Sequence, residues 1–291
     1  YNINTNSNMA GTVYEDSYKT NLATAFLESP SIIVKAMFLI VVLVVFTILF
    51  RVGIFILSYT FEVDKTPTLI DGLKKGKTSF VITQDPSQKN SIPVIRSKNE
   101  RDGLEFTWSV WLLIDDIHYL KGQYRHIFHK GNNKFQMSDG EELAKKGLNY
   151  PNNAPGLYIA PNTNDLVVVM NTFSNVSEQV PIKNIPLNKW FNIMIRCEGN
   201  NLDVYMNGLV VVRRKLADVP KQNYGNVYTS QNGGFSGYLS DLKYFNHAVH
   251  ISDVNKIMRN GPNMKTDEDS MTKSYPPYLS FRWFLRNDSE I

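Results

Sequence analysis

Residues 202–212, LDVYMNGLVVV, contain the clearest structural signal in this sequence. Two strand-like runs flank the pair Asn207-Gly208. Asn-Gly readily adopts the positive φ angles of a type I′ turn, so the stretch predicts a two-residue β-hairpin. An isolated hairpin is only marginally stable in water. The hairpin therefore has to pack against further strands.

Strand-like patterns continue on both sides of this hairpin. Apolar residues occupy every second position from Phe106 to Ile114, which is the period of a β-strand with one buried face. Further strand-like runs cover residues 126–129, 156–160, 166–170, 190–197 and 235–245. Many short strands joined by Asn, Gly and Pro turns, with no helical run between them, indicate an antiparallel β-sandwich.

Three phrases of this region carry a family resemblance. They are FTWSVW at 106–111, KWFNI at 189–193 leading into LDVYMNG at 202–208, and FSGYLSDLKYFN at 235–246. In this order they resemble the concanavalin A-like (laminin G/pentraxin-like) jelly-roll domain, over residues 104–261. The resemblance implies a short helix after the closing strand, and residues 252–258 fit it, with Ser252 as the N-cap.

A long apolar run, AMFLIVVLVVFTILFRVGIFIL at residues 36–57, precedes the strands. As a helix it measures about 33 Å, close to the roughly 30 Å of a bilayer's hydrocarbon core. It has no polar stripe of helical period, so we expect one transmembrane helix over 32–59. Arg51 lies near enough to the end of the run to extend its charge to the interface. The residues that represent the span are Ala36, Phe38, Val45, Phe50, Arg51 and Leu57.

The surroundings of the run favour a permanent anchor with a cytosolic C-terminal part. About 35 mostly polar residues precede the run, which does not fit the short N-terminal region of a signal peptide. Lysines are more frequent on its C-terminal side, and Cys197 is the single cysteine. Two glycosylation sequons, at Asn175 and Asn287, favour the opposite orientation.

The sequence divides into five predicted parts. Residues 1–31 are a polar arm with a short helix, 32–59 the transmembrane helix, and 60–103 a connector partly packed on the sandwich, with edge strands at 80–82 and 92–95. The sandwich occupies 104–261, and 262–291 form a C-terminal arm. Aromatic residues and Arg, which dominate interface energies, gather in this arm. They are candidates for docking a partner, or for folding back on the sandwich: Tyr275, Tyr278, Phe281, Arg282, Trp283 and Phe284.

Catalysis, cofactors and nucleic-acid binding are not expected. The net charge of +4 is distributed without a basic block, so no nucleic-acid surface is indicated. Glycanases of the resembled fold place Glu-x-Asp-x-Glu along one strand, and no strand here has that pattern. Asp115 and Asp116 are adjacent, so in a strand they point to opposite faces, and Glu141-Glu142 lie in a polar insert.

Metal binding is also weakly indicated. His126 and His129 are three residues apart on a predicted strand, which puts them on opposite faces as structural histidines, whereas His247 and His250 could converge on a helical turn. We expect Cys197 in the core. Some relatives in the resembled family bind calcium at the sandwich rim. Oxygen ligands for calcium, or ordinary polar turn residues, are Asp115, Asp116, Asn162, Asn164 and Asp165.

The order of the parts carries a second, narrower resemblance. An N-terminal span, a connector containing ITQDP (82–86) and IPVIRSKN (92–99), and a lectin-like sandwich are similar to membrane-anchored minor capsid proteins of large icosahedral DNA viruses, including those of algae (chlorella virus-like). The resemblance implies a virion protein that joins an inner membrane to the shell, with the bilayer and capsid proteins as partners and the C-terminal domain facing the shell. The alternative is a membrane-anchored lectin, in which Trp108, Trp111 and Tyr158 are candidates for stacking on sugars, although strand alternation places at least one of the two tryptophans in the core.

Overall fold

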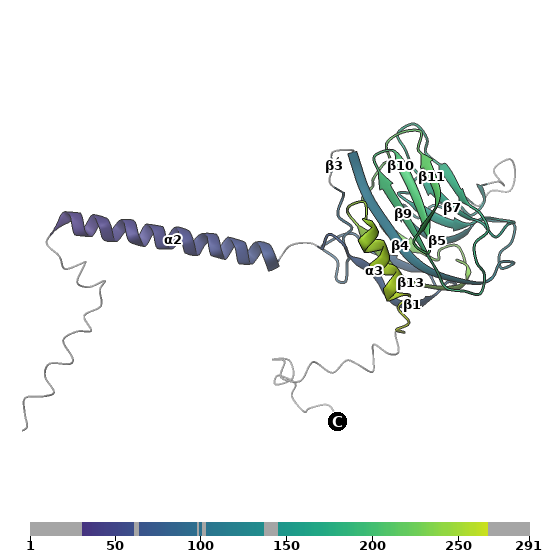
Figure 1. The fold of residues 1–291 in the computed structure, drawn as a ribbon, viewed down its shortest axis with the longest axis horizontal. Helices are drawn as coiled ribbons and strands as arrows, with labels where there is room; N and C mark the ends of the chain where they lie inside the picture. The colour runs from purple at the N-terminus through teal and green to yellow at the C-terminus, as the bar shows by residue number, and fades with distance from the viewer. Residues whose placement is uncertain (1–30, 61–63, 98, 101–102, 137–144, 267–291) are drawn as a thin grey trace, which may run out of the picture. The chain divides into compact units, whose positions relative to one another are not determined.

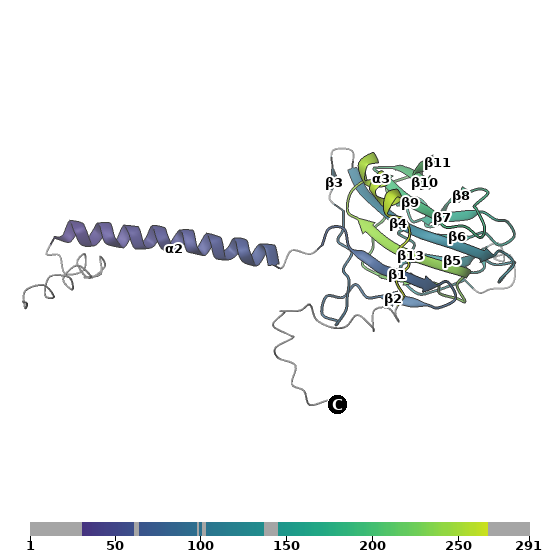
Figure 2. The same ribbon diagram turned by 60° about the horizontal axis from the view of Figure 1, so that its bottom comes forward.

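The computed structural model describes residues 31–60, 64–97, 99–100, 103–136 and 145–266. The chain separates into two compact units, Tyr1–Glu62 and Val63–Ile291. In its described part the first unit is a single helix, α2, over Ile32–Thr60. The second is mainly β, with two antiparallel sheets that form a sandwich (Figures 1 and 2). The predicted fold class, an antiparallel sandwich after one apolar helix, is confirmed.

Sheet A contains the N-terminal edge strand, the long closing strand and the central hairpin. Its order is β1-β13-β4-β9-β10-β11, and the short β3 pairs with β4. The bounds are β1 Thr68–Lys75, β3 Asn99–Glu100, β4 Gly103–Asp116, β9 Phe191–Glu198, β10 Asn201–Met206, β11 Leu209–Lys215 and β13 Ser236–Phe245. All of its pairings are antiparallel. β1 and β13, the first and last strands of the second unit, lie side by side in this sheet.

Sheet B packs over sheet A and has the order β2-β12-β5-β6-β7-β8. Its strands are β2 Phe80–Ile82, β5 Arg125–Gly131, β6 Gly156–Ile159, β7 Leu166–Met170, β8 Glu178–Ile182 and β12 Asn226–Thr229. β2 lies at the edge of the sheet, where it pairs with β12. The pattern expected at 92–95 forms no strand, although Ile92 and Val94 pack against the core.

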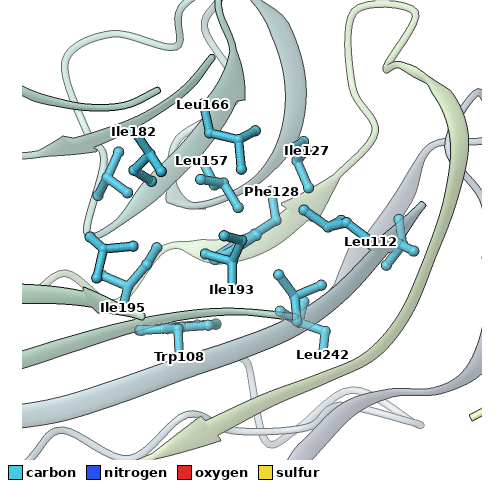
Figure 3. Packing of buried hydrophobic residues seen from close by; sticks show 14 of the residues in the cluster. Trp108, Leu112, Ile127, Phe128, Leu157, Leu166, Ile182, Ile193, Ile195 and Leu242 are labelled. Atoms are coloured by element: carbon cyan, nitrogen blue, oxygen red, sulfur yellow. The ribbon is translucent and has the colours of Figure 1, made fainter. Parts of the chain in front are cut away.

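The main core fills the space between the two sheets (Figure 3). The alternation in β4 has the predicted result, because Trp108 and Leu112 point inward and are 1% and 0% exposed. The Trp108 ring lies with its centroid 5.4 Å from that of Phe128 and 5.1 Å from that of Tyr244. Cys197 also belongs to this cluster, as expected, and burial raises the pKa of its thiol to about 12.

The central hairpin has the predicted turn. Asn207 and Gly208 have φ angles of 52° and 82°, as a type I′ turn requires. Val204 pairs with Val212 and Met206 with Leu209, and the register shift between them marks a bulge in β11. β11 is the last strand in the order of sheet A.

Helix α3, Ile251–Asn260, packs on the outer face of sheet A (Figures 1 and 2). Val254 and Ile257 are buried against Met194 of β9. The expected N-cap, Ser252, is wrong: the cap is His250, and Ser252 lies within the helix. The Asp253 carboxylate accepts a hydrogen bond of 3.3 Å from the His250 backbone N–H, which fixes this earlier start.

Candidate functional site

α2 exposes apolar side chains all around its surface. Val45, Phe50 and Leu57 are 49%, 59% and 57% exposed, and among the described residues none of its most apolar window is buried. Its 29 residues measure about 43 Å at 1.5 Å per residue, which exceeds the roughly 30 Å of a hydrocarbon core. The helix is therefore long and apolar enough to cross a membrane, as a membrane anchor or a signal sequence is.

All six residues predicted to represent the span lie within α2. Ala36, Val45, Phe50, Arg51 and Leu57 are exposed and Phe38 is half-exposed. Because the helix continues to Thr60, Arg51 lies about 13 Å before its end. That distance is longer than expected from the apolar run alone. The long Arg51 side chain can extend along the helix and bring its charge closer to the helix end.

A cavity of about 610 Å³ opens at the end of the sandwich where β4 begins and β9 and β13 end. Its floor consists of aromatic side chains of the core, Phe106, Trp108 and Tyr244, each 3% exposed or less. We call it the sandwich-end cavity. Its volume is in the usual range for sites that bind small ligands. The residues that line it are Val94, Ile95, Arg96, Gly103, Leu104, Phe106, Trp108, Lys130, Ala154, Phe173, Gly199, Asn200, Val219, Pro220, Lys221, Gln222, Asn223, Tyr224 and Tyr244.

Cations and aromatic rings surround the opening of this cavity. Tyr224 is 88% exposed and Phe173 is 65% exposed. The Lys221 ammonium lies 4.9 Å from the centre of the Phe173 ring, in a cation–π contact. Neither Phe173 nor Tyr224 was predicted as a site residue from the sequence, since each lies in an irregular loop with no periodic pattern. The cavity thus combines an apolar floor with exposed rings at the rim.

Lys130, at the end of β5, is the buried cation of the cavity. Its side chain is 6% exposed, and its ammonium donates a 2.6 Å hydrogen bond to the Gly225 carbonyl. Burial lowers the pKa of Lys130 to about 8, because the charged form loses hydration. The Asn223 amide holds this strand end in place by donating 3.1 Å to the Lys130 carbonyl.

The three aromatic residues proposed to stack on sugars are buried, so that assignment is wrong. Trp108 forms part of the cavity floor, whereas Trp111 faces the other side of sheet A and is 8% exposed. Tyr158 is fully buried on the outer side of sheet B, where its hydroxyl donates 2.6 Å to Asn153 Oδ1. Strand alternation accounts for the opposite directions of the two tryptophans, but both faces are covered.

The histidines of β5 lie on the same face, which corrects the prediction of opposite faces. A register shift between His126 and Phe128 marks a bulge, so two core residues separate the two histidines. His126 Nε2 and His129 Nδ1 are 2.7 Å apart. Both rings contact Phe135, at 5.3 and 5.7 Å between centroids.

Hydrogen bonds at both ends fix this histidine pair as neutral. The Gln231 backbone N–H donates 2.9 Å to His126 Nδ1, so Nε2 carries the proton and donates to His129 Nδ1. His129 Nε2 then donates to the Asn132 carbonyl at 2.7 Å. Burial lowers the pKa of His129 to about 4, and burial together with the neighbouring ring lowers the pKa of His126 well below its ordinary value. The pair is structural, as expected.

The calcium candidates lie at the exposed end of β4 and in the loop between β6 and β7. Asp165 accepts hydrogen bonds from the Thr163 hydroxyl and the Asn184 backbone, and Asp116 accepts one from the His118 backbone. Asn164 donates to the Ile185 carbonyl at 3.4 Å, and Asp115 is exposed at the end of β4. These contacts are those of polar turn residues, and Asn162 lies in the same turn as Asp165.

Metal ligands do not cluster in the part of the chain that the structure describes, where no group of three or more His, Cys, Asp or Glu is placed to hold an ion. His250 caps α3, while the ring of His247 hydrogen-bonds to Asn246, so these two histidines take separate structural roles. The partner-docking candidates Tyr275, Tyr278, Phe281, Arg282, Trp283 and Phe284 lie outside the described residues, as do Glu141 and Glu142.

β11 is the most apolar exposed strand of the sandwich. Leu209, Val210 and Val211 are 73%, 45% and 45% exposed, and they precede Arg213-Arg214-Lys215. Arg213 is paired with the buried Asp203 carboxylate at 2.7 Å, which ties the strand to β10. Exposed apolar edge strands are uncommon in soluble proteins because they invite pairing with another chain. β11 is therefore a candidate surface for a protein partner.

Comparisons with known proteins found distant similarity to solved structures. No family model matches the chain, and no curated protein matches it. Solved structures with a similar fold include the binding domain of botulinum neurotoxin serotype G (14% identity, 65% of this chain, 46% of that chain, TM-score 0.42) and the receptor-binding domain of botulinum neurotoxin D (14%, 67%, 52%, 0.43). The chain spans about half the length of these structures, and similarity at this level carries no argument about function.

Proposed function

We propose that this protein is a non-enzymatic membrane tether, a minor capsid protein that joins a viral inner membrane to the overlying shell. The single observation that supports it best is α2, whose apolar side chains are not covered by any other described residue of its own unit. A bilayer supplies that covering. In the sequence, residues 61–63 alone connect the end of the helix to the first described residue of the sandwich unit.

The sandwich supplies the second contact in this proposal. β11 presents exposed Leu209, Val210 and Val211 at the edge of sheet A, where an extended segment of a shell protein can add a strand. Main-chain hydrogen bonds give such pairing its affinity, and side-chain pockets give it specificity. The C-terminal arm, residues 275–285, adds aromatic side chains suited to a second contact with the shell.

Residue-resolved crosslinking on intact purified particles, followed by detergent stripping, tests the tether. We expect crosslinks from β11 and from residues 275–285 to shell proteins, with α2 extracted together with lipid. No calcium and no substrate are required for these contacts. A sandwich that forms no crosslink to any shell protein, or that is glycosylated at the exposed Asn175, would contradict the proposal.

A second candidate function is a membrane-anchored carbohydrate-binding protein. The observation that favours it is the sandwich-end cavity, with Phe173 and Tyr224 exposed at its rim. Exposed rings beside a concave site provide flat apolar surfaces for ligands that also need polar contacts. Binding to a glycan array that is lost in Tyr224→Ala, together with the absence of shell crosslinks, would select this function over the tether.

A further inference from the structure

Several polar groups in the sandwich-end cavity have unused hydrogen-bonding capacity. The Lys130 ammonium has three N–H donors, and the 2.6 Å bond to the Gly225 carbonyl is the one hydrogen bond found for it among the described residues. The side chain is 6% exposed, so it is largely withdrawn from bulk solvent and borders only the cavity. A buried cation with no carboxylate beside it is unfavourable unless a ligand supplies the missing acceptor.

Gln222 contributes the second unused group. Its Nε2 donates 3.0 Å to the Ser97 hydroxyl, and its Oε1 is buried without a partner in the described part of the chain. An unpaired buried amide oxygen costs roughly 1–3 kcal/mol. Gln222 lines the cavity, so a rotation of its amide that turns this oxygen toward the cavity lets a ligand hydroxyl donate to it and remove the cost.

The charge of the lining selects the sign of the ligand. Arg96, Lys130 and Lys221 line the cavity, and none of its described lining residues is acidic. The described lining therefore offers a ligand three positive charges and no negative one. A neutral sugar or a cation leaves the buried Lys130 uncompensated. The lining favours an organic anion.

The remaining lining selects the shape of the ligand. Amide side chains of Asn200, Gln222 and Asn223 stand near the aromatic floor and the exposed rings. A fatty acid has an anionic head but no hydroxyl for Gln222, and a free inorganic anion has no face to place on Tyr224. A sugar ring with an acidic substituent has a C–H face, several hydroxyls and a negative charge.

We infer that the sandwich-end cavity binds an acidic saccharide, a sugar that carries a carboxylate or a sulfate. The anionic group pairs with Lys130, a hydroxyl donates to Gln222 Oε1, and the C–H face of the ring lies on Tyr224 or Phe173. The inference rests on the second candidate function, carbohydrate binding, and names its ligand class. It is independent of the tether, because the cavity and β11 share no residue.

Calorimetric titration of the full chain, held in phosphatidylcholine nanodiscs, tests this inference. The probes are digalacturonate and its dimethyl ester, which has the same rings without the two charges. We expect the acid to bind about tenfold more tightly than the ester, the gain typical of one charge-assisted hydrogen bond. The variants Lys130→Met, Lys221→Met and Tyr224→Ala each weaken binding of the acid several-fold.

The matched control is Lys183→Met, since Lys183 is exposed and lies outside the cavity. This variant leaves binding unchanged. The unfolding midpoint of Lys130→Met shows whether this variant folds. If it does not, Lys221→Met and Tyr224→Ala still decide the test, because Lys221 is half-buried and Tyr224 is exposed. Loss of binding in Lys183→Met as large as in Lys221→Met would reduce the effect to net charge and overturn the inference.

Three further outcomes overturn the inference, and they separate it from the function on which it rests. Equal affinity for acid and ester leaves carbohydrate binding in place and rejects the acidic class. Displacement of digalacturonate by equimolar inorganic sulfate shows a simple anion site and rejects the saccharide. Binding of neither probe, nor of any sugar on a glycan array, rejects both the ligand class and the second candidate function.

Discussion

α2 and the sandwich both contain large apolar side chains and arrange them in opposite ways. In the sandwich, Leu112 and Trp108 are 0% and 1% exposed, because the facing sheet covers them. In α2, Val45 and Phe50 remain 49% and 59% exposed, because the described part of their unit is a single helix with nothing packed on it. Burial of such a side chain contributes about 1.5–3 kcal/mol. The sandwich gains this energy by folding, whereas α2 gains it only from another apolar phase.

This difference shows where each region's stability comes from. A core strand depends on its neighbours in the protein, so a change in it affects the folded state. A lipid-facing helix satisfies its own backbone hydrogen bonds and depends on the bilayer, so a change in it affects membrane insertion. The same substitution in the two regions should therefore have separable effects.

An aspartate placed in each region should give the largest contrast. Leu112→Asp buries a carboxyl group between the sheets and should destabilise the sandwich by more than about 4 kcal/mol, enough to unfold it. Val45→Asp should leave the thermal midpoint of the sandwich unchanged and raise the free energy of insertion by about 2.5–3.5 kcal/mol. Tryptophan fluorescence melts and the membrane-bound fraction measure the two effects. A lowered thermal midpoint of the sandwich in Val45→Asp would show that the stability of the sandwich depends on α2.

Removal of one aromatic side chain from each region should give a smaller contrast. Trp108 packs on Phe128 and Tyr244, so Trp108→Ala should lower the free energy of unfolding by about 3–5 kcal/mol. Phe50→Ala in α2 should change it by less than about 0.5 kcal/mol. Denaturant titration of both variants in the same detergent measures the difference. Equal losses would show that α2 is part of the folded core.

Acid should destabilise the sandwich through its buried histidine pair. The pKa of His129 is about 4 in the folded protein against 6.5 as the ordinary value, so the unfolded chain binds more protons between these pH values. The free energy of unfolding should therefore fall as the pH falls from 6.5 to 4, by roughly 3 kcal/mol for His129. Melts across this pH range measure the loss.

Two variants isolate the contribution of this pair. The double variant His126→Gln/His129→Gln should flatten the pH profile between 4 and 6.5, because neither amide titrates. His118→Gln removes an exposed histidine and should leave the profile unchanged. A double variant with the native slope would assign the acid sensitivity to other groups.

The smallest effect on stability is expected at the β11 edge. Val211→Lys should change the free energy of unfolding by no more than about 0.5 kcal/mol, because Val211 is already 45% exposed. It should nevertheless abolish crosslinks from β11 to shell proteins, since a lysine on an edge strand opposes strand addition. Val81→Lys on the edge strand β2, 51% exposed, is the matched control and should keep those crosslinks. Crosslinks that survive Val211→Lys would place the partner elsewhere.

The sequence predicted those parts of the fold that depend on regular patterns. The alternation from Phe106 to Ile114 and the Asn207-Gly208 turn led directly to β4 and to the central hairpin, since both follow from local geometry. β1 was missed because Gly72 interrupts its pattern. There the chain has a φ of 95° and a register shift against β13, which only a paired neighbour makes stable.

The candidate site was less predictable because it is assembled from distant loops. Lys130, Phe173 and Tyr224 are separated along the sequence and have no motif in common, so their convergence depends on the pairing of the two sheets. The prediction that His126 and His129 point to opposite faces of the sheet was wrong, because a bulge breaks the two-residue period of the strand. By contrast, α2 could be predicted from composition, since a bilayer requires only length and apolarity.

The proposed tether requires that α2 remains joined to the sandwich as a membrane anchor. The most direct test is mass spectrometry of the mature protein from carbonate-washed membranes, with peptide coverage across residues 36–57. The anchor predicts that peptides from α2 and from the sandwich remain together in the membrane pellet, in one uncleaved chain. A mature chain that begins after Leu57 and appears in the supernatant would contradict it, because α2 would then be a removed signal sequence.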